Sequence, residues 1–195
     1  MGFKAVVIGA SAGGIDVLKN ILSKLPSNFV LPIIIVLHMK DDKHSNISEY
    51  FRNHCNLEVK EAENYMQIKK SEVYFALPNY HILVEKNETL TLSVEDKVNY
   101  SRPSIDVLFE TAADVYGKDL IGIILSGANG DGSEGLLEIN KRGGLCIVQD
   151  PKTAEMDKMP IEAINKVDTD YILTVDGIAE AQIEYTNLKR NGGAR

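Results

Sequence analysis

The sequence is poor in cysteine and has no long apolar run. Its two cysteines, Cys55 and Cys146, lie far apart and share no spacing of the kind that metal sites use. We therefore expect both to be reduced residues of the interior, as is usual in the cytoplasm. The longest apolar run, at residues 31–37, is too short to span a bilayer, which needs about 20 apolar residues. The first apolar segment, residues 5–8, is too short for a secretory signal and is followed by glycine.

Basic residues are outnumbered by acidic ones, 21 against 28, and the formal net charge is -7. A nucleic-acid partner would need a basic face, so this balance argues against one while leaving a protein partner open. The composition, 44% hydrophobic and 25% charged, is typical of a soluble globular protein. A length of 195 residues suffices for one α/β domain. We expect a single domain over residues 1–189 and a frayed tail over residues 190–195.

Apolar segments of strand length alternate with stretches of helical periodicity along most of the chain. Strands are predicted at residues 3–8, 30–37, 57–61, 72–76, 120–125, 145–148 and 171–175. Helices are predicted at residues 15–25, 47–54, 105–115, 133–143 (capped by Ser133), from Pro160, and at 178–188. Residues 81–84 and 90–94 alternate apolar and polar side chains around a turn, which is typical of a hairpin. The sequence therefore predicts an α/β fold with a doubly wound, mostly parallel sheet and an antiparallel hairpin at one edge.

Residues 6–14 (VVIGASAGG) read as a buried strand, a turn of small residues and the start of a helix. Such a turn has three readings that the stretch alone leaves open. It can expose Ser11 as a nucleophile. It can admit a dinucleotide phosphate to the helix N-terminus through Gly9, Ser11 and Gly14, with Asp41 near a ribose. It can also be a plain strand-to-helix turn. The nucleotide reading is weakened because Ser11 takes the place of the second glycine of the fingerprint.

Three polar residues follow predicted parallel strands at their carboxyl ends. Ser11 follows the first strand, His38 the second, and Asp131 lies just beyond the strand at residues 120–125. Ligand sites of open α/β sheets lie at this edge, and Ser, His and Asp are the residues of nucleophilic acyl transfer. Each also has a structural reading, as a small turn residue, a strand end and an Asp-Gly turn. All four histidines precede position 82, so the late histidine of an α/β-hydrolase is missing.

Other side chains fit structural roles better. His44, His54 and Cys55 make a weak metal candidate, because His44 lies in a polar loop while the other two complete a helix face. We expect no metal site and no cofactor. Arg102 starts a helix, although its guanidinium could bind a carboxylate. Met156 and Met159 fit a lid or core packing.

Several short motifs in a fixed order resemble the catalytic domain of the chemotaxis methylesterase CheB family. They are residues 8–14 (IGASAGG), 37–39 (LHM), 73–78 (VYFALP) with His81, 102–109 (RPSIDVLF), 124–127 (ILSG) with 131–132 (DG), 135–136 (GL), and 159–160 (MP) with 163–164 (AI). The resemblance covers the chain from residue 6 to about residue 175. Each motif is weak by itself, whereas their order is specific.

The resemblance implies a hydrolase of glutamate γ-methyl esters on the cytoplasmic helices of methyl-accepting chemoreceptors, releasing methanol. Some members also deamidate glutamine at those sites. By motif, Ser11 corresponds to the nucleophile, His38 to the general base and Asp131 to its partner. The backbone N–H groups of Ala12 and Ala128 correspond to the oxyanion hole, and an ester hydrolase needs such donors. Arg102 is a candidate substrate contact. The family also implies a cytoplasmic location and no membrane insertion.

The sequence departs from the family pattern in three places and lacks one domain. Ala128 replaces a methionine in a loop where glycine and asparagine are exchanged, Leu37 replaces a glutamine or similar residue, and Lys158 replaces a glycine. These changes leave open a second hypothesis, an inactive receptor-binding module of the same fold. Gly9 already lies in the first strand, so the sequence holds no receiver domain ahead of it. We expect a stand-alone member or part of a longer protein, with a separate or fused regulatory or methyltransferase domain.

Overall fold

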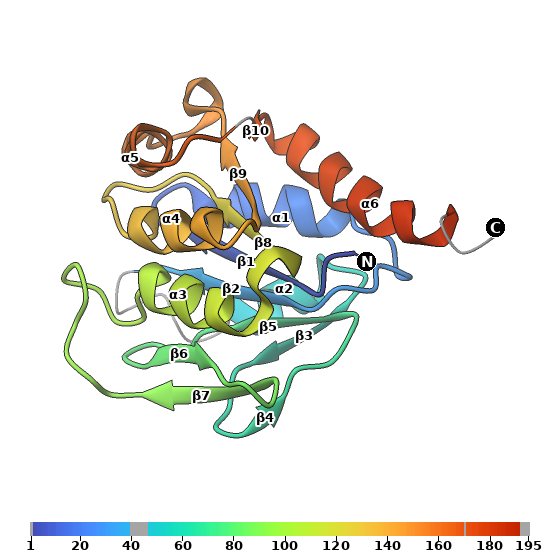
Figure 1. The fold of residues 1–195 in the computed structure, drawn as a ribbon, viewed down its shortest axis with the longest axis horizontal. Helices are drawn as coiled ribbons and strands as arrows, with labels where there is room; N and C mark the ends of the chain where they lie inside the picture. Colours follow the sequence, from blue (N-terminus) through green and yellow to red (C-terminus); the bar gives the residue numbers. More distant parts are fainter. Residues whose placement is uncertain (1, 40–46, 170, 192–195) are drawn as a thin grey trace.

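A seven-stranded parallel sheet forms the centre of the computed structural model, which describes residues 2–39, 47–169 and 171–191 (Figure 1). The strand order is β10-β9-β8-β1-β2-β5-β3, and every neighbouring pair is parallel. The strands are β1 (Ala5–Ala10), β2 (Ile33–Leu37), β3 (Glu58–Glu61), β5 (Glu72–Phe75), β8 (Leu120–Ile124), β9 (Leu145–Gln149) and β10 (Tyr171–Leu173). The predicted doubly wound α/β fold is confirmed.

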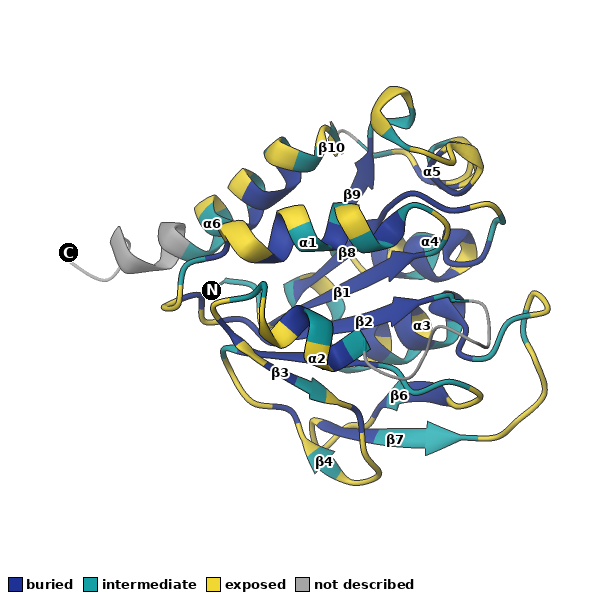
Figure 2. Ribbon diagram, turned by 180° about the vertical axis from the view of Figure 1, so that it is seen from behind, coloured by how far each residue is buried: buried dark blue, intermediate teal, exposed yellow. Residues whose placement is uncertain are grey.

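Helices cover both faces of this sheet, so it has two cores. The helices are α1 (Gly14–Lys24), α2 (Ile47–Arg52), α3 (Ile105–Tyr116), α4 (Ser133–Lys141), α5 (Lys158–Lys166) and α6 (Val175–Asn191), with 3-10 turns η2 (Gly117–Asp119) and η3 (Pro151–Thr153). In β1, Val6 and Ile8 pack toward α1, α2 and α6, whereas Ala5 and Val7 pack toward α3, α4 and α5. Figure 2 shows the central strands β1, β2 and β8 buried while each helix keeps an exposed outer face.

The predicted hairpin is present, but it belongs to a second sheet. Its strands β6 (His81–Val84) and β7 (Thr89–Ser93) pair antiparallel, and β7 also pairs with β4 (Met66–Gln67). Ile82 and Val84 of β6 share a buried cluster with Leu108 and Ala112 of α3. The hairpin therefore covers the outer side of α3 as a third layer rather than extending the edge of the main sheet (Figure 1).

Several predicted boundaries differ from the observed ones. Ser133 was expected to cap α4, but Gly132 takes the N-cap position with φ 98, and Ser133 is the first helical residue. A left-handed φ is unfavourable for a serine and open to glycine, which explains the shift. Helix α5 begins two residues before Pro160. The backbone of α6 continues through Asn191, and the rest of the predicted tail, residues 192–195, lies outside the described residues.

Candidate active site

Three turns meet at the carboxyl edge of the sheet, because β1 lies between β2 and β8. Backbone hydrogen bonds continue across these strand ends. The amide of Ser11 donates to the carbonyl of Ser126 at 2.9 Å, and the amide of His38 donates to the carbonyl of Ala10 at 2.9 Å. The topology thus brings Ser11, His38 and the loop that leads to Asp131 to one edge, where open α/β sheets carry their sites.

A glycine and a buried hydroxyl fix the conformation of the turn after β1. Gly13 has φ 76, and a Cβ there would lie 2.7 Å from the Cβ of Glu155. The hydroxyl of Ser126 donates to the carbonyl of Ala12 at 2.8 Å and accepts from the amide of Met156 at 3.0 Å. These contacts fix the direction of the Ala12 peptide, so the residue after Ser11 has a defined orientation.

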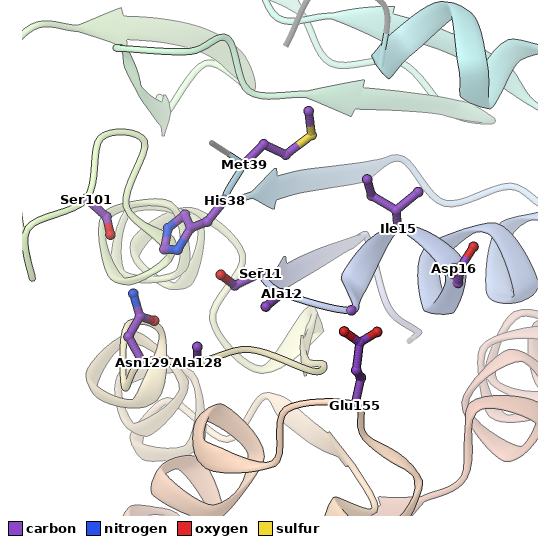
Figure 3. A pocket seen from close by; sticks show the side chains of 11 residues that line it. Ser11, Ala12, Ile15, Asp16, His38, Met39, Ser101, Ala128, Asn129 and Glu155 are labelled. Carbon is purple, nitrogen blue, oxygen red and sulfur yellow. The ribbon is translucent and has the colours of Figure 1, made fainter. Parts of the chain in front are cut away.

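A pocket of about 700 Å³ opens over these turns. Ser11, Ala12, His38 and Ala128 line it, and Figure 3 shows the Ser11 hydroxyl directed toward the ring of His38. Within the described residues, the amides of Ala12 and Ala128 have no hydrogen-bond partner. Two unpaired N–H groups beside one hydroxyl are what an oxyanion hole requires.

His38 and Asp131 lie in direct contact. Nε2 of His38 is 3.0 Å from Oδ2 of Asp131. Its geometry is not that of a hydrogen bond, so the pair is an electrostatic contact. The other ring nitrogen, Nδ1, is left for Ser11. The two predicted partners are thus brought together by the tertiary structure.

Asp131 is fully buried at the N-terminus of α3. Its carboxylate accepts hydrogen bonds from the Ser104 hydroxyl at 2.8 Å and from the amides of Ile105 and Asp106 at 2.7 and 3.2 Å. Burial raises its pKa, but the contacts with His38, Ile105 and Ser104 outweigh burial and leave the pKa below its usual value. An ionised Asp131 can stabilise a protonated His38, which is the electrostatic role of a triad carboxylate.

A second Ser–His–Asp set shares Asp131. The amide of Ser104 donates to Nδ1 of His81 at 3.1 Å, while the Ser104 hydroxyl donates to Asp131. Since an amide can only donate, Nδ1 of His81 is the acceptor, and its Nε2–H donates to the carbonyl of Asp96 at 3.0 Å. Ser104 is 0% exposed and caps α3, so no substrate ester reaches its hydroxyl. This set holds Asp131 in place and supplies no nucleophile.

Asp106 is a buried carboxyl that sequence reasoning missed. One oxygen accepts from the amide of Gly135 at 2.8 Å and the other from the Asn99 amide group at 2.7 Å. Burial, together with the nearby charge of Asp131, raises the pKa of Asp106 to about 7. A sequence signal existed, because Asp106 shares a helix face with the buried Phe109 and Ala113, at i, i+3 and i+7.

Asp106→Asn is expected to become more stable relative to the wild type as the pH rises. The wild type holds a proton on Asp106 that the unfolded chain loses, so its stability falls as the pH rises from about 4 to about 7. The variant has no such proton. The unfolding free energy of the variant minus that of the wild type should therefore increase by roughly 1–3 kcal/mol across that pH window. Urea unfolding of both proteins at about pH 5 and about pH 8 measures this. A difference that is constant with pH would contradict it.

Arg102 and the other singled-out residues are placed as follows. Nη1 of Arg102 donates to the carbonyls of Val94 and Glu95 at 2.7 and 2.9 Å, so this nitrogen is already hydrogen-bonded to the backbone of the preceding loop. Met159 is buried in the core, whereas Met156 is exposed. Both cysteines are free thiols; Cys146 is buried as predicted, whereas Cys55 is only half-buried. Among the described residues, no group of three or more His, Cys, Asp or Glu could hold a metal ion, and Asp41 and His44 lie outside those residues.

Comparisons with known proteins agree on one family. The family model described as CheB methylesterase matches residues 6–182. A Leptospira interrogans protein assigned as a protein-glutamate methylesterase/protein-glutamine glutaminase is 48% identical over 192 residues, covering 97% of this chain and 100% of the relative. A Pyrococcus abyssi enzyme of the same name is 33% identical and is covered over 52% of its length. The crystal structure of the Thermotoga maritima CheB methylesterase catalytic domain superposes with a TM-score of 0.89 at 33% identity, covering 94% of this chain and 99% of that one.

Proposed function

The chain belongs to the CheB methylesterase family as a protein-glutamate methylesterase/glutamine glutaminase, and we propose that Ser11, His38 and Asp131 are its catalytic triad. The proposal is supported by the pocket that Ser11 and His38 share and by the 3.0 Å contact between His38 and Asp131. The observation that carries it is the pair of unpaired amides, at Ala12 and Ala128, beside the Ser11 hydroxyl.

The first half of the reaction forms an acyl-enzyme. His38 takes the proton of the Ser11 hydroxyl, and the oxygen attacks the carbonyl carbon of the glutamate γ-methyl ester. The amides of Ala12 and Ala128 bind the oxyanion of the tetrahedral intermediate. The intermediate collapses, the C–O bond to the methoxy group breaks, and the protonated His38 gives its proton to the leaving methanol. Asp131 stabilises the protonated ring throughout this half.

The second half returns the free enzyme. His38 takes a proton from water, and the hydroxide attacks the glutamyl ester on Ser11. Collapse of the second intermediate breaks the bond to Ser11, which takes the proton back from His38, and releases the glutamic acid side chain, which then loses its proton to solvent. A glutamine side chain follows the same route with ammonia as the leaving group. The net change consumes one water for each ester or amide.

The altered loop at Ala128 retains its backbone anchors. The amide of Gly127 donates to the carbonyl of Met156, and the carbonyl of Gly127 accepts from the amide of Met159, both at 3.0 Å. An oxyanion donor on the backbone does not depend on the side chain at position 128. These anchors favour an active enzyme over an inactive receptor-binding module. The nucleotide alternative is disfavoured because Asp16 and Glu155 line the pocket and would repel a phosphate.

The substrates proposed for this chain are the methylated cytoplasmic helices of chemoreceptors, and its proposed location is the cytoplasm. No described helix is long and apolar enough to cross a membrane. The chain covers the whole Leptospira relative but about half of the Pyrococcus one. The regulation proposed for it is by a separate or fused regulatory or methyltransferase domain.

Methanol release tests the function directly. The purified chain should release methanol from a methylated cytoplasmic fragment of a chemoreceptor and none from the unmethylated fragment. Gas chromatography of the headspace measures it. A folded chain that releases no methanol from the methylated fragment would contradict the proposed function.

Arg102→Ala is expected to weaken substrate binding more than turnover. The net charge of -7 opposes an acidic substrate, and Arg102 supplies positive charge beside His38. We expect the KM for the methylated fragment to rise about fivefold with a smaller fall in kcat. Steady-state kinetics at low and high salt measures both. Arg142→Ala is the charge-matched control, because Arg142 pairs with Glu138 and Asp114 and lines no part of the pocket. A fall in kcat alone would contradict the prediction.

A further inference from the structure

The loop between β7 and α3, residues 94–102, forms one rim of the active-site pocket and is called the rim loop below. Ser101 lines the main pocket together with Ser11 and His38. Lys97 and Tyr100 line an adjoining hollow of about 180 Å³ whose wall also includes His38. The rim loop therefore extends the wall of the active site outward from the proposed general base.

The rim loop is pinned at both ends and in its middle. Nη1 of Arg102 donates to the carbonyls of Val94 and Glu95, which closes the loop on itself. The amide group of Asn99 donates to Asp106 at 2.7 Å and lies 3.4 Å from Asp131. Val98 and Ser101 exchange two backbone hydrogen bonds. A loop with these anchors presents a fixed surface, which lowers the entropy lost when a partner binds.

Two large apolar side chains stand out from this loop. Tyr100 is 98% exposed and Val94 is 66% exposed. Asn99 and Tyr100 are consecutive residues with φ 50 and φ 63, a conformation that costs non-glycine residues about 1 kcal/mol or more each. Exposed aromatic groups on a strained, anchored loop beside a pocket are typical of a binding surface, because Tyr buries a large area when a partner covers it.

The charges around the pocket are divided between its two sides. Of the charged residues that line the two hollows, Lys97 and Arg102 lie on the rim-loop side, next to His38, whereas the exposed Glu95 and Asp96 of the rim loop line neither hollow. Asp16 and Glu155 lie on the opposite side, toward α1, as Figure 3 shows. An acidic segment whose ester enters the pocket is therefore repelled from the α1 side and attracted to the two cations that line the smaller hollow, Lys97 and Arg102.

We propose that the rim loop is the docking surface for the acidic, glutamate-rich segment of the substrate protein that carries the methyl ester. Tyr100 and Val94 pack on apolar side chains of that segment, and Lys97 faces its carboxylates. This inference rests on the proposed function and assigns the part of the site that selects a protein over a small ester. It predicts that the rim loop contributes to specificity without touching the reacting atoms.

Tyr100→Ala should lower the preference for the protein substrate. The two substrates are a methylated chemoreceptor cytoplasmic fragment and N-acetylglutamic acid γ-methyl ester. The ratio of kcat/KM for the fragment to kcat/KM for the small ester should fall about tenfold, mainly through a higher KM for the fragment. Lys97→Glu should lower the same ratio, with the loss diminishing at high salt.

Tyr65→Ala is the matched control. Tyr65 is also exposed, at 82%, and has φ 63, but it precedes β4 and lines neither hollow. Its ratio should equal that of the wild type. An unchanged ratio in Tyr100→Ala, or an equal fall in Tyr65→Ala, overturns the docking surface, as does an equal loss toward both substrates. A wild type that hydrolyses neither substrate refutes the proposed function instead, so the two failures are distinguishable.

Discussion

Ser11→Ala is expected to abolish methanol release and to leave the fold intact. Removing the nucleophile of a serine hydrolase lowers kcat by about 10⁴-fold or more. The amide of Ser11 donates to the carbonyl of Ser126, and its carbonyl accepts from the amide of Gly14. Neither hydrogen bond needs the hydroxyl. Within the described residues, no hydrogen bond of that hydroxyl stabilises the fold. The melting temperature should therefore stay within about 2 °C of the wild type.

Ser104→Ala is the matched control, because Ser104 belongs to the other Ser–His–Asp set. It removes a hydrogen bond to Asp131 and the cap of α3, so we expect about 1 kcal/mol less stability. The turnover number should fall only about tenfold, because the nucleophile remains. Methanol release and thermal unfolding of both variants are the measurements. A dead Ser104→Ala beside an active Ser11→Ala would reverse the assignment of the nucleophile.

Asp131→Asn is expected to lose activity and stability together. The substitution removes the negative charge that stabilises protonated His38, and comparable changes in serine proteases lower kcat about 10⁴-fold. It also places a donor NH₂ where the carboxylate accepts from Ser104, Ile105 and Asp106. One of these buried donors loses its acceptor, which should cost about 1–3 kcal/mol of unfolding free energy.

The adjacent buried carboxyl supplies the control for Asp131→Asn. Asp106→Asn changes the same chemical group at the same end of α3, but Asp106 does not contact His38. We expect it to retain at least about a tenth of the wild-type kcat. Single-turnover kinetics with a methylated fragment, at matched folded fractions, separates loss of chemistry from loss of fold. A wild-type rate in Asp131→Asn would remove Asp131 from the triad.

The local patterns of the sequence predict the central sheet and the edge of that sheet at which the candidate site lies. Continuous β-branched segments and helical spacing predict the parallel strands, because strands covered on both faces must be apolar throughout. Once the strands are parallel, their carboxyl ends share an edge, so Ser11, His38 and Asp131 are expected at that edge, and the observed strand order then makes them neighbours. The order of the short motifs indicated the CheB methylesterase family, and the family match over residues 6–182 confirmed it.

Short or irregular features could not be predicted from those patterns. Strand β4 has two residues, too few to show any period, and it is defined only by pairing with β7. That pairing makes the hairpin part of a second sheet on α3. Likewise, the N-cap of α4 depends on the left-handed φ of Gly132, which is set by the loop around it.

The sequence by itself therefore determined the central parallel sheet, the helices beside it and the sheet edge at which the residues of the proposed triad lie. Only the tertiary structure decided which groups surround them. Asp106 has its raised pKa because burial and the nearby charge of Asp131 outweigh the hydrogen bond from the Gly135 amide, which lowers it. Tyr100 is exposed on a loop that Asn99 anchors to the buried Asp106. The physical reason is that periodicity reports local burial, whereas pKa, contact and exposure arise from residues that are far apart in the chain.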